Sequence, residues 1–177
     1  MSSYVYLGVR TLAVIVLVAA FWPVLGDVYD GMLLGVASVF FPVGMAANAV
    51  SGQIYFDFSA VARQEEGMYV QGLLLALGLA LSVALVICTP AMSILRRAVS
   101  LAAVLLLLFV LHVAGISLLA RGLWLATQEN SQTFTVGGVM TGFAIFWALL
   151  PAVLGGVWCY LYWLPHLKAV GKSPQRS

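Results

Sequence analysis

Long apolar runs alternate with short polar stretches along this chain. Four of these runs approach or exceed the roughly 20 residues that a helix needs to cross a bilayer, namely residues 9–26, 70–89, 98–120 and 136–164. A fifth run, residues 31–50, is broken by Pro42 and several small residues, so we interpret it as an amphipathic or re-entrant segment. The pattern predicts an all-α transmembrane helical bundle with four spans, or alternatively five, that forms a single integral membrane domain over residues 1–177.

Residues 51–69 follow a different pattern, and in their first half apolar and polar side chains alternate as they do along a strand. One face of this segment carries Ile54, Phe56 and Phe58, and the other carries Gln53, Tyr55 and Asp57. A strand needs a partner for its backbone groups, so we predict a short β-hairpin-like insert that turns around the sequence ARQEEG. Gly67 ends that sequence and is free to adopt the positive φ of a tight turn.

The composition agrees with a membrane protein, since 63% of the residues are hydrophobic and 8% are charged, against about a quarter charged in soluble domains. The basic residues lie between or beyond the apolar runs, so they indicate topology rather than nucleic-acid binding. Four spans with both termini inside put six of them on the inner side: Arg10, Arg96, Arg97, Lys168, Lys172 and Arg176. Only Arg63 and Arg121 then lie outside, whereas five spans give at best five inside and three outside.

This division predicts a multi-pass protein of the bacterial inner (cytoplasmic) membrane, with both termini cytoplasmic and the insert at residues 51–69 extracytoplasmic. In the four-span arrangement every acidic residue falls on the outer side: Asp27, Asp30, Asp57, Glu65, Glu66 and Glu129. The first apolar run follows Arg10 and has no small-x-small cleavage site after it, so we expect an uncleaved anchor helix.

Small residues recur at helical spacing in two of the spans. Gly72, Ala76, Ala80 and Ala84 lie four residues apart, and Gly138 and Gly142 form a GxxxG motif. Such stripes let helices approach closely in lipid. We interpret both as packing within the chain rather than as dimer faces.

His112 lies inside an apolar span, and ionisable residues inside a membrane are candidates for function. The structural interpretation is a neutral imidazole hydrogen-bonded across the bundle, so that no cofactor is required; the alternative is a ligand for haem or a chlorophyll-type pigment. Cys88 and Cys159 both lie in apolar runs and are interpreted as unpaired thiols. Neither is expected to reach a histidine, and no metal-ligand spacing is present, so the sequence offers no convincing enzyme site.

The polar outer residues form a candidate docking surface for a partner: Tyr55, Asp57, Arg63, Glu65, Glu66 and Arg121. Ion pairs of Arg63 with Glu65 or Glu66, and of Arg121 with Glu129, are the structural alternative.

The order of these segments, with the pieces GQIYFDF, EEGMYVQGLLLAL and RRAVSLAAVLLL, resembles the exosortase and archaeosortase family over about residues 27–122. The resemblance implies a catalytic cysteine where the insert meets the next helix, but this chain reads EEGMYVQG there. Arg121 matches an arginine of the family, whereas the loop TQENSQTFT lacks the family's later histidine. The resemblance therefore implies one of the non-catalytic, exosortase-associated membrane proteins.

The leading hypothesis is a non-enzymatic accessory or scaffold protein of a protein-sorting or cell-envelope system, with the lipid bilayer and a larger membrane protein or enzyme as partners. Two alternatives stay open. One is a small subunit of a photosynthetic or respiratory complex in which His112 ligates a pigment, and the other is a divergent membrane transpeptidase.

Overall fold

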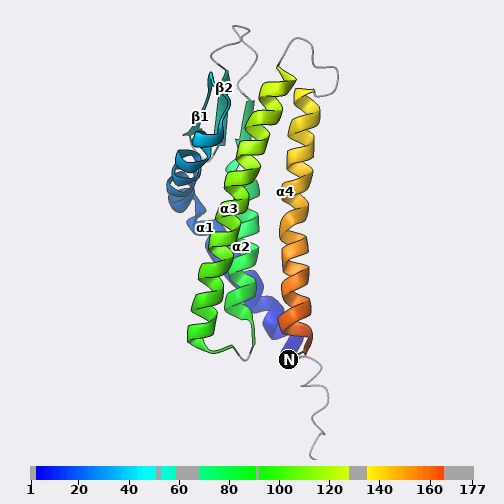
Figure 1. Ribbon diagram of the computed structural model, residues 1–177. Helices are drawn as coiled ribbons and strands as arrows, with labels where there is room; N and C mark the ends of the chain where they lie inside the picture. The colour runs from blue at the N-terminus through cyan, green and yellow to red at the C-terminus, as the bar shows by residue number, and fades with distance from the viewer. Residues whose placement is uncertain (1–2, 51–52, 59–67, 91, 128–134, 166–177) are drawn as a thin grey trace, which may run out of the picture.

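The computed structural model describes residues 3–50, 53–58, 68–90, 92–127 and 135–165. In chain order the elements are the helix α1 (Ser3–Ala37), the short 3-10 helix η1 (Ser38–Phe40), the strands β1 (Met45–Val50), β2 (Gln53–Phe58) and β3 (Met68–Gln71), the helices α2 (Gly72–Cys88), α3 (Ile94–Ala126) and α4 (Val136–Trp158), and the π-helical turn η2 (Cys159–Trp163). The protein is a helical bundle that carries a small sheet at one end (Figure 1).

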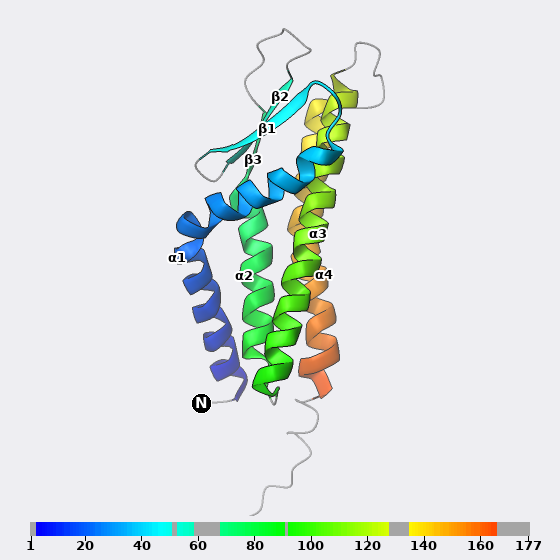
Figure 2. The same ribbon diagram turned by 60° about the vertical axis from the view of Figure 1, so that its left-hand side comes forward.

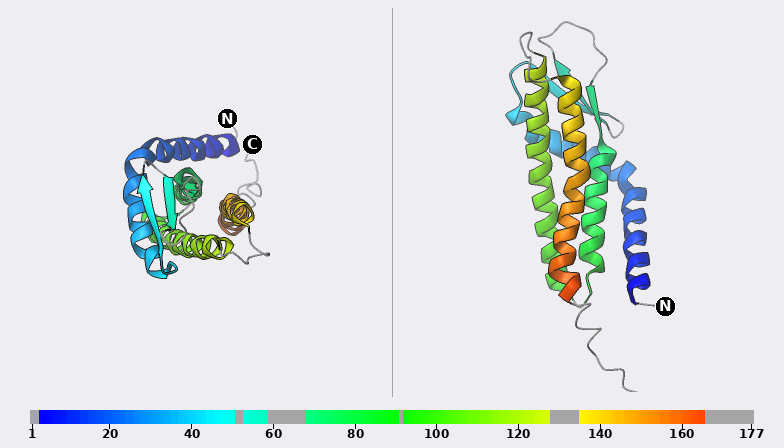
Figure 3. Two further views of the ribbon diagram at one scale, coloured as in Figure 1. Left: turned by 90° about the horizontal axis from the view of Figure 1, so that it is seen from above. Right: turned by 90° about the vertical axis from the view of Figure 1, so that its right-hand side faces the viewer.

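The helices α2, α3 and α4 run side by side along the bundle, and α1 follows a different path (Figures 1 and 2). The first half of α1 runs beside α2; the helix then bends, and its second half crosses the bundle beneath the sheet toward α3 (Figure 2). Seen from above, the two halves form a corner (Figure 3). Pro23 lies inside α1, and a proline in a helix interior removes a backbone donor and bends the helix.

Three helical segments are long and apolar enough to cross a membrane, judged by length and composition: Val5–Phe40, Ile94–Ala126 and Val136–Trp163. Helix α2 is shorter, since its 17 residues extend about 25 Å at 1.5 Å per residue, against a hydrocarbon layer of roughly 30 Å. It contacts each of the other three helices, and most of its described side chains are buried, which makes it the inner helix of the bundle. The first residues of α1 and the turn η2 lie at the end of the bundle opposite the sheet (Figure 3).

The three strands form one antiparallel sheet in the order β1-β2-β3. The pairing of β2 with β3, in which Ile54 lies opposite Val70 and Tyr55 opposite Tyr69, confirms the predicted hairpin partner. Its turn at ARQEEG, with Gly67, lies outside the described residues. The predicted alternation is also confirmed, because Ile54 and Phe56 are buried while Asp57 is exposed.

The strand β1 corrects the interpretation of residues 31–50 as one amphipathic or re-entrant segment. Residues 31–37 instead complete α1, and residues 45–50 pair with β2 from Met45 opposite Phe58 to Val50 opposite Gln53. The chain reverses between them at Pro42, which cannot donate a backbone hydrogen bond, and at Gly44, whose φ of 83° suits glycine. The insert is a three-stranded sheet rather than an isolated hairpin.

The main core lies where the inner face of the sheet, the second half of α1 and the sheet end of α2 and α3 meet. Its buried members include Leu33, Leu34, Ala37, Ile54, Phe56, Val70, Leu75, Ile116, Leu119, Ala120 and Leu123. The sheet is thus fixed to the bundle by apolar packing, and it presents its other face outward.

The two small-residue stripes differ in their burial. Ala76, Ala80 and Ala84 are all buried, so the stripe of α2 packs within the chain as predicted. Gly142 is exposed, and a Cβ atom placed on it would meet nothing within 4 Å. Gly138 is exposed as well, and the only neighbour of its Cβ position is the hydroxyl of its own helix cap, Thr135, at 3.0 Å. The interpretation of GxxxG as packing within the chain is therefore wrong for the part of the chain that the structure describes.

Candidate functional site

A cluster of polar aromatic side chains lies inside the bundle, where the second half of α1 meets α3 and α4. The hydroxyl of Tyr29 is hydrogen-bonded to Nδ1 of His112, and the rings meet edge to face with centroids 5.7 Å apart. On its other side His112 packs against Trp147 of α4, with a centroid distance of 4.5 Å. His112 is completely buried and Trp147 nearly so. This contact confirms the expectation that His112 is hydrogen-bonded across the bundle.

The close fit of Trp147 depends on Gly115, which lies almost one turn after His112 on α3. A Cβ atom on Gly115 would lie 2.4 Å from Cζ2 of Trp147, closer than real atoms approach. Glycine therefore lets the indole ring lie against the α3 backbone beside the imidazole. Among the described residues, neither Nε2 of His112 nor Nε1 of Trp147 has a hydrogen-bond partner.

Asp30 is the least expected member of this region. It follows Tyr29 on α1, is completely buried, and neither of its carboxyl oxygens has a hydrogen-bond partner among the described residues. Burying a carboxylate without a partner is strongly unfavourable, so this group is poorly stabilised by the part of the chain that the structure describes. From the sequence, Asp30 is only one of the acidic residues expected on the outer side. The available signal was its spacing from Gly26, Leu33 and Ala37, which places it on the buried face of α1.

The surroundings of His112 do not fit a haem or a chlorophyll-type pigment. Nδ1 already binds Tyr29, and the ring is enclosed by Tyr29 on one side and Trp147 on the other. His112 lines none of the three cavities described for this structure. A planar macrocycle would have to displace Tyr29 or Trp147 to reach Nε2.

The two cysteines are both free thiols and lie at the end of the bundle away from the sheet. Cys88 is the last residue of α2 and is buried, and Cys159 begins η2 and is partly buried. His112 lies several helical turns away from this end, toward the middle of α3, so neither thiol contacts it. His166 lies outside the described residues. The residues that the structure describes contain no group of three or more His, Cys, Asp or Glu side chains placed to hold a metal ion.

The outward face of the sheet carries two of the predicted docking residues, Tyr55 and Asp57. The registers of the three strands align Asn48, Tyr55 and Tyr69 in one row across the sheet. The rings of Tyr55 and Tyr69 are 5.7 Å apart, and the Tyr55 hydroxyl donates to the side-chain oxygen of Gln53. Asp57 is exposed in the next row.

The other predicted docking residues are Arg63, Glu65 and Glu66, which lie outside the described part of the chain, and Arg121. Arg121 is exposed near the sheet end of α3. It lines a cavity of about 300 Å³ between that end of α3 and the segment after α1, together with Phe40, Phe41, Pro42, Trp124 and Leu125. Its predicted partner Glu129 also lies outside the described residues.

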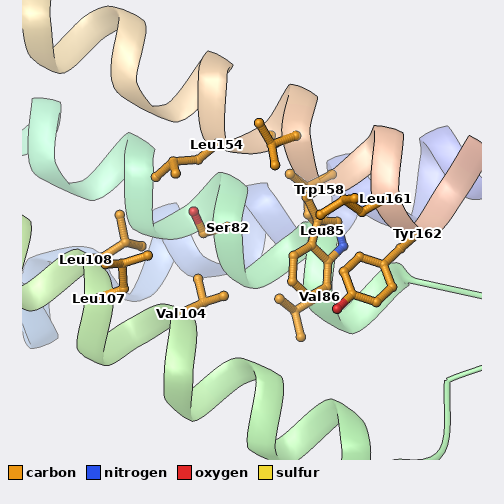
Figure 4. A pocket seen from close by; sticks show the side chains of 12 residues that line it. Ser82, Leu85, Val86, Val104, Leu107, Leu108, Leu154, Trp158, Leu161 and Tyr162 are labelled. Atoms are coloured by element: carbon orange, nitrogen blue, oxygen red, sulfur yellow. The ribbon is translucent and has the colours of Figure 1, made fainter.

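The opposite end of the bundle is organised around Thr89, which is buried just after α2. Its hydroxyl oxygen accepts hydrogen bonds from the indoles of Trp158, at 2.9 Å, and Trp163, at 3.3 Å. Its carbonyl oxygen accepts from the Arg97 guanidinium at 2.9 Å. Thr89 thereby joins the ends of three helices. Beside it lies an apolar cavity of about 250 Å³ between α2, α3 and α4 (Figure 4).

Comparisons with known proteins do not assign a family: no protein-family model, no curated protein and no solved structure matches this chain.

Proposed function

We propose that this protein is a non-enzymatic accessory or scaffold subunit of the bacterial inner membrane, which docks a larger membrane protein through its three-stranded sheet. The observation that carries the proposal is the free edge of β1. Within the described residues β1 pairs only with β2, and its sequence MAANAV contains no charged residue and no proline. Natural proteins usually protect edge strands with such residues, so an unprotected edge favours pairing with another chain.

The outward face next to this edge supports the same use. Tyrosine is enriched at protein interfaces because it combines a large apolar ring with a hydrogen-bonding hydroxyl. Tyr55 and Tyr69 lie in one row with Asn48 of the edge strand, and Tyr69 is 45% exposed. Asp57 adds a carboxylate to this face and Arg121 a guanidinium at the same end of the bundle. A partner strand added beside β1 would continue the row.

The four-span topology belongs to this proposal. If α2 crosses the membrane in addition to the three longer helices, the chain has four spans and the sheet lies outside the membrane. The basic residues of α1 and of the start of α3 then lie inside, as the positive-inside rule favours. The resemblance to exosortase-associated proteins supports a protein-sorting or envelope system as the setting. The pigment-binding alternative gains no support from the geometry around His112, and the transpeptidase alternative gains none from the positions of Cys88 and Cys159.

Site-specific crosslinking in native membranes tests the proposal. A photoreactive residue in place of Tyr55 should give one dominant adduct with a larger membrane protein. Ala46→Lys adds a charge to the exposed edge strand and should abolish that adduct, because edge lysines oppose strand addition. Val43→Lys is the matched control, since Val43 is 98% exposed beside the strand but outside it. A protein that gives no adduct, or the same adduct with Ala46→Lys, contradicts docking through the sheet.

A further inference from the structure

The apolar cavity at the end of the bundle opposite the sheet is suited to hydrocarbon. Its lining comes from α2, α3, α4 and η2 and is apolar apart from the Ser82 hydroxyl and the polar atoms of Trp158 and Tyr162 (Figure 4). Water is not stable in an apolar cavity, whereas an apolar space of about 150 Å³ already holds a benzene molecule. At about 250 Å³, this cavity has room for several methylene groups. Left empty, it would forfeit the dispersion contacts of its lining.

The cavity is open toward the surrounding lipid. Three lining residues are among the exposed large hydrophobic side chains, namely Leu107 (49%), Val157 (53%) and Leu161 (56%). The helices that carry them, α3 and the α4–η2 segment, are long and apolar enough to span a membrane. An acyl chain can therefore enter sideways from the bilayer without passing through water.

One end of the cavity is connected to a cationic group. Trp158 and Tyr162 close this end, with rings stacked at 4.4 Å, and the Trp158 indole shares Thr89 with the guanidinium of Arg97. The Nε atom of Arg97 is buried and has no hydrogen-bond partner among the described residues. Arg96 lies next to it and is exposed. Because Nε is enclosed by the protein, a phosphate would bind the exposed guanidinium of Arg96 and the part of the Arg97 side chain that stays accessible, in the geometry that guanidinium groups favour.

We infer that this cavity holds one acyl chain of an anionic phospholipid, with the lipid phosphate bound by Arg96 and Arg97. The apolar lining selects a hydrocarbon chain, and the two arginines select a negative headgroup, as basic pockets between spanning helices do. Trp158, which lines the cavity, and Arg97 both donate hydrogen bonds to Thr89, and this residue links the two parts of the site. The site lies at the other end of the bundle from the sheet, so its test is independent of partner docking.

Native mass spectrometry of the full-length protein in mild detergent tests this inference. Phosphatidylglycerol and phosphatidylcholine with identical acyl chains are titrated in parallel. The wild-type protein should bind one phosphatidylglycerol in preference to phosphatidylcholine. Val104→Phe fills the cavity from α3 and should weaken phosphatidylglycerol binding about tenfold, which corresponds to about 1.4 kcal/mol. Val110→Phe is the matched control, because Val110 is exposed on the same helix and does not line the cavity.

The headgroup is tested separately from the chain. Arg97→Gln should remove the preference for phosphatidylglycerol, and Arg96→Gln, which does not disturb the contact with Thr89, should reduce it. Arg10→Gln removes an exposed arginine of α1 and should leave the preference unchanged. Ser82→Leu fills the cavity from α2 and serves as a second test if Val104→Phe does not fold. Equal binding of the two lipids by the wild type, or undiminished binding by folded Val104→Phe or Ser82→Leu, overturns the inference.

Discussion

The Tyr29 hydroxyl is hydrogen-bonded to Nδ1 of His112, which lies 83 residues away along the chain. This contact fastens the crossing half of α1 to the middle of α3. Tyr29 also meets Trp22 of its own helix and Phe109 of α3, with ring centroids 5.8 Å and 6.0 Å apart. The crossing half of α1 is therefore held to α3 by a polar contact as well as by apolar packing.

Tyr29→Phe keeps the ring and removes only this hydrogen bond. We expect a loss of unfolding free energy of about 1 kcal/mol, the usual scale for hydrogen bonds between membrane helices, because Nδ1 of His112 is left without a partner. Equilibrium unfolding in mixed micelles measures the change. Tyr6→Phe is the matched control, since Tyr6 lies on the same helix and is 61% exposed. Equal stability of the two variants would show that the contact contributes nothing to folding.

The approach of α4 to α3 gives a second prediction. Gly115→Ala should lower the unfolding free energy by about 1–3 kcal/mol, because the new methyl group would overlap the buried Trp147 ring. Gly142→Ala makes the same chemical change on α4 where the Cβ position is open. It should be neutral or stabilise the helix by up to about 1 kcal/mol. Thermal unfolding followed by circular dichroism compares the pair, and a tolerated Gly115→Ala contradicts the packing described here.

Much of the fold follows from local pattern. The alternation from Gln53 to Asp57 predicts a strand with a buried face and requires a partner strand, and both are present. The spacing of Ala76, Ala80 and Ala84 predicts the packed face of α2. These features could be predicted because each depends on a periodicity that is contained within a few residues.

The remaining features depend on contacts between distant segments. The sequence MAANAV is rich in alanine, which favours helices and is depleted in strands, so β1 is a strand because β2 supplies its hydrogen bonds. Helix α1 continues past Pro23 and Asp27 to Ala37, although these residues indicate an end. A helix satisfies its own backbone groups, and in lipid no solvent can do so. The meeting of Tyr29, His112 and Trp147 requires α1 to bend and then to continue as a helix toward α3. Pro23 accounts for a bend, but no local pattern specifies which distant side chains then meet.

Thr89 provides a third prediction, at the end of the bundle opposite the sheet. Thr89→Val keeps the shape of the side chain but removes the oxygen that accepts from Trp158 and Trp163. We expect a loss of about 1–2 kcal/mol, since two indole N–H groups lose their acceptor, and a shift in the tryptophan fluorescence of the folded protein. Thr141→Val, at an exposed position of α4, should change neither quantity. Unchanged fluorescence in Thr89→Val would contradict the arrangement of the two indoles.

Asp30 gives the last prediction, because its buried carboxyl group has no hydrogen-bond partner within the described segments that would make it favourable for folding. Asp30→Leu replaces it with an apolar side chain of similar reach and should raise the unfolding free energy by about 1–3 kcal/mol. Asp27→Leu, at an exposed position on the same helix, should leave stability unchanged. Residues that destabilise a fold and yet occupy its interior are typical of functional sites. Equilibrium unfolding in mixed micelles measures both variants, and a destabilised Asp30→Leu would show instead that Asp30 makes a favourable contact.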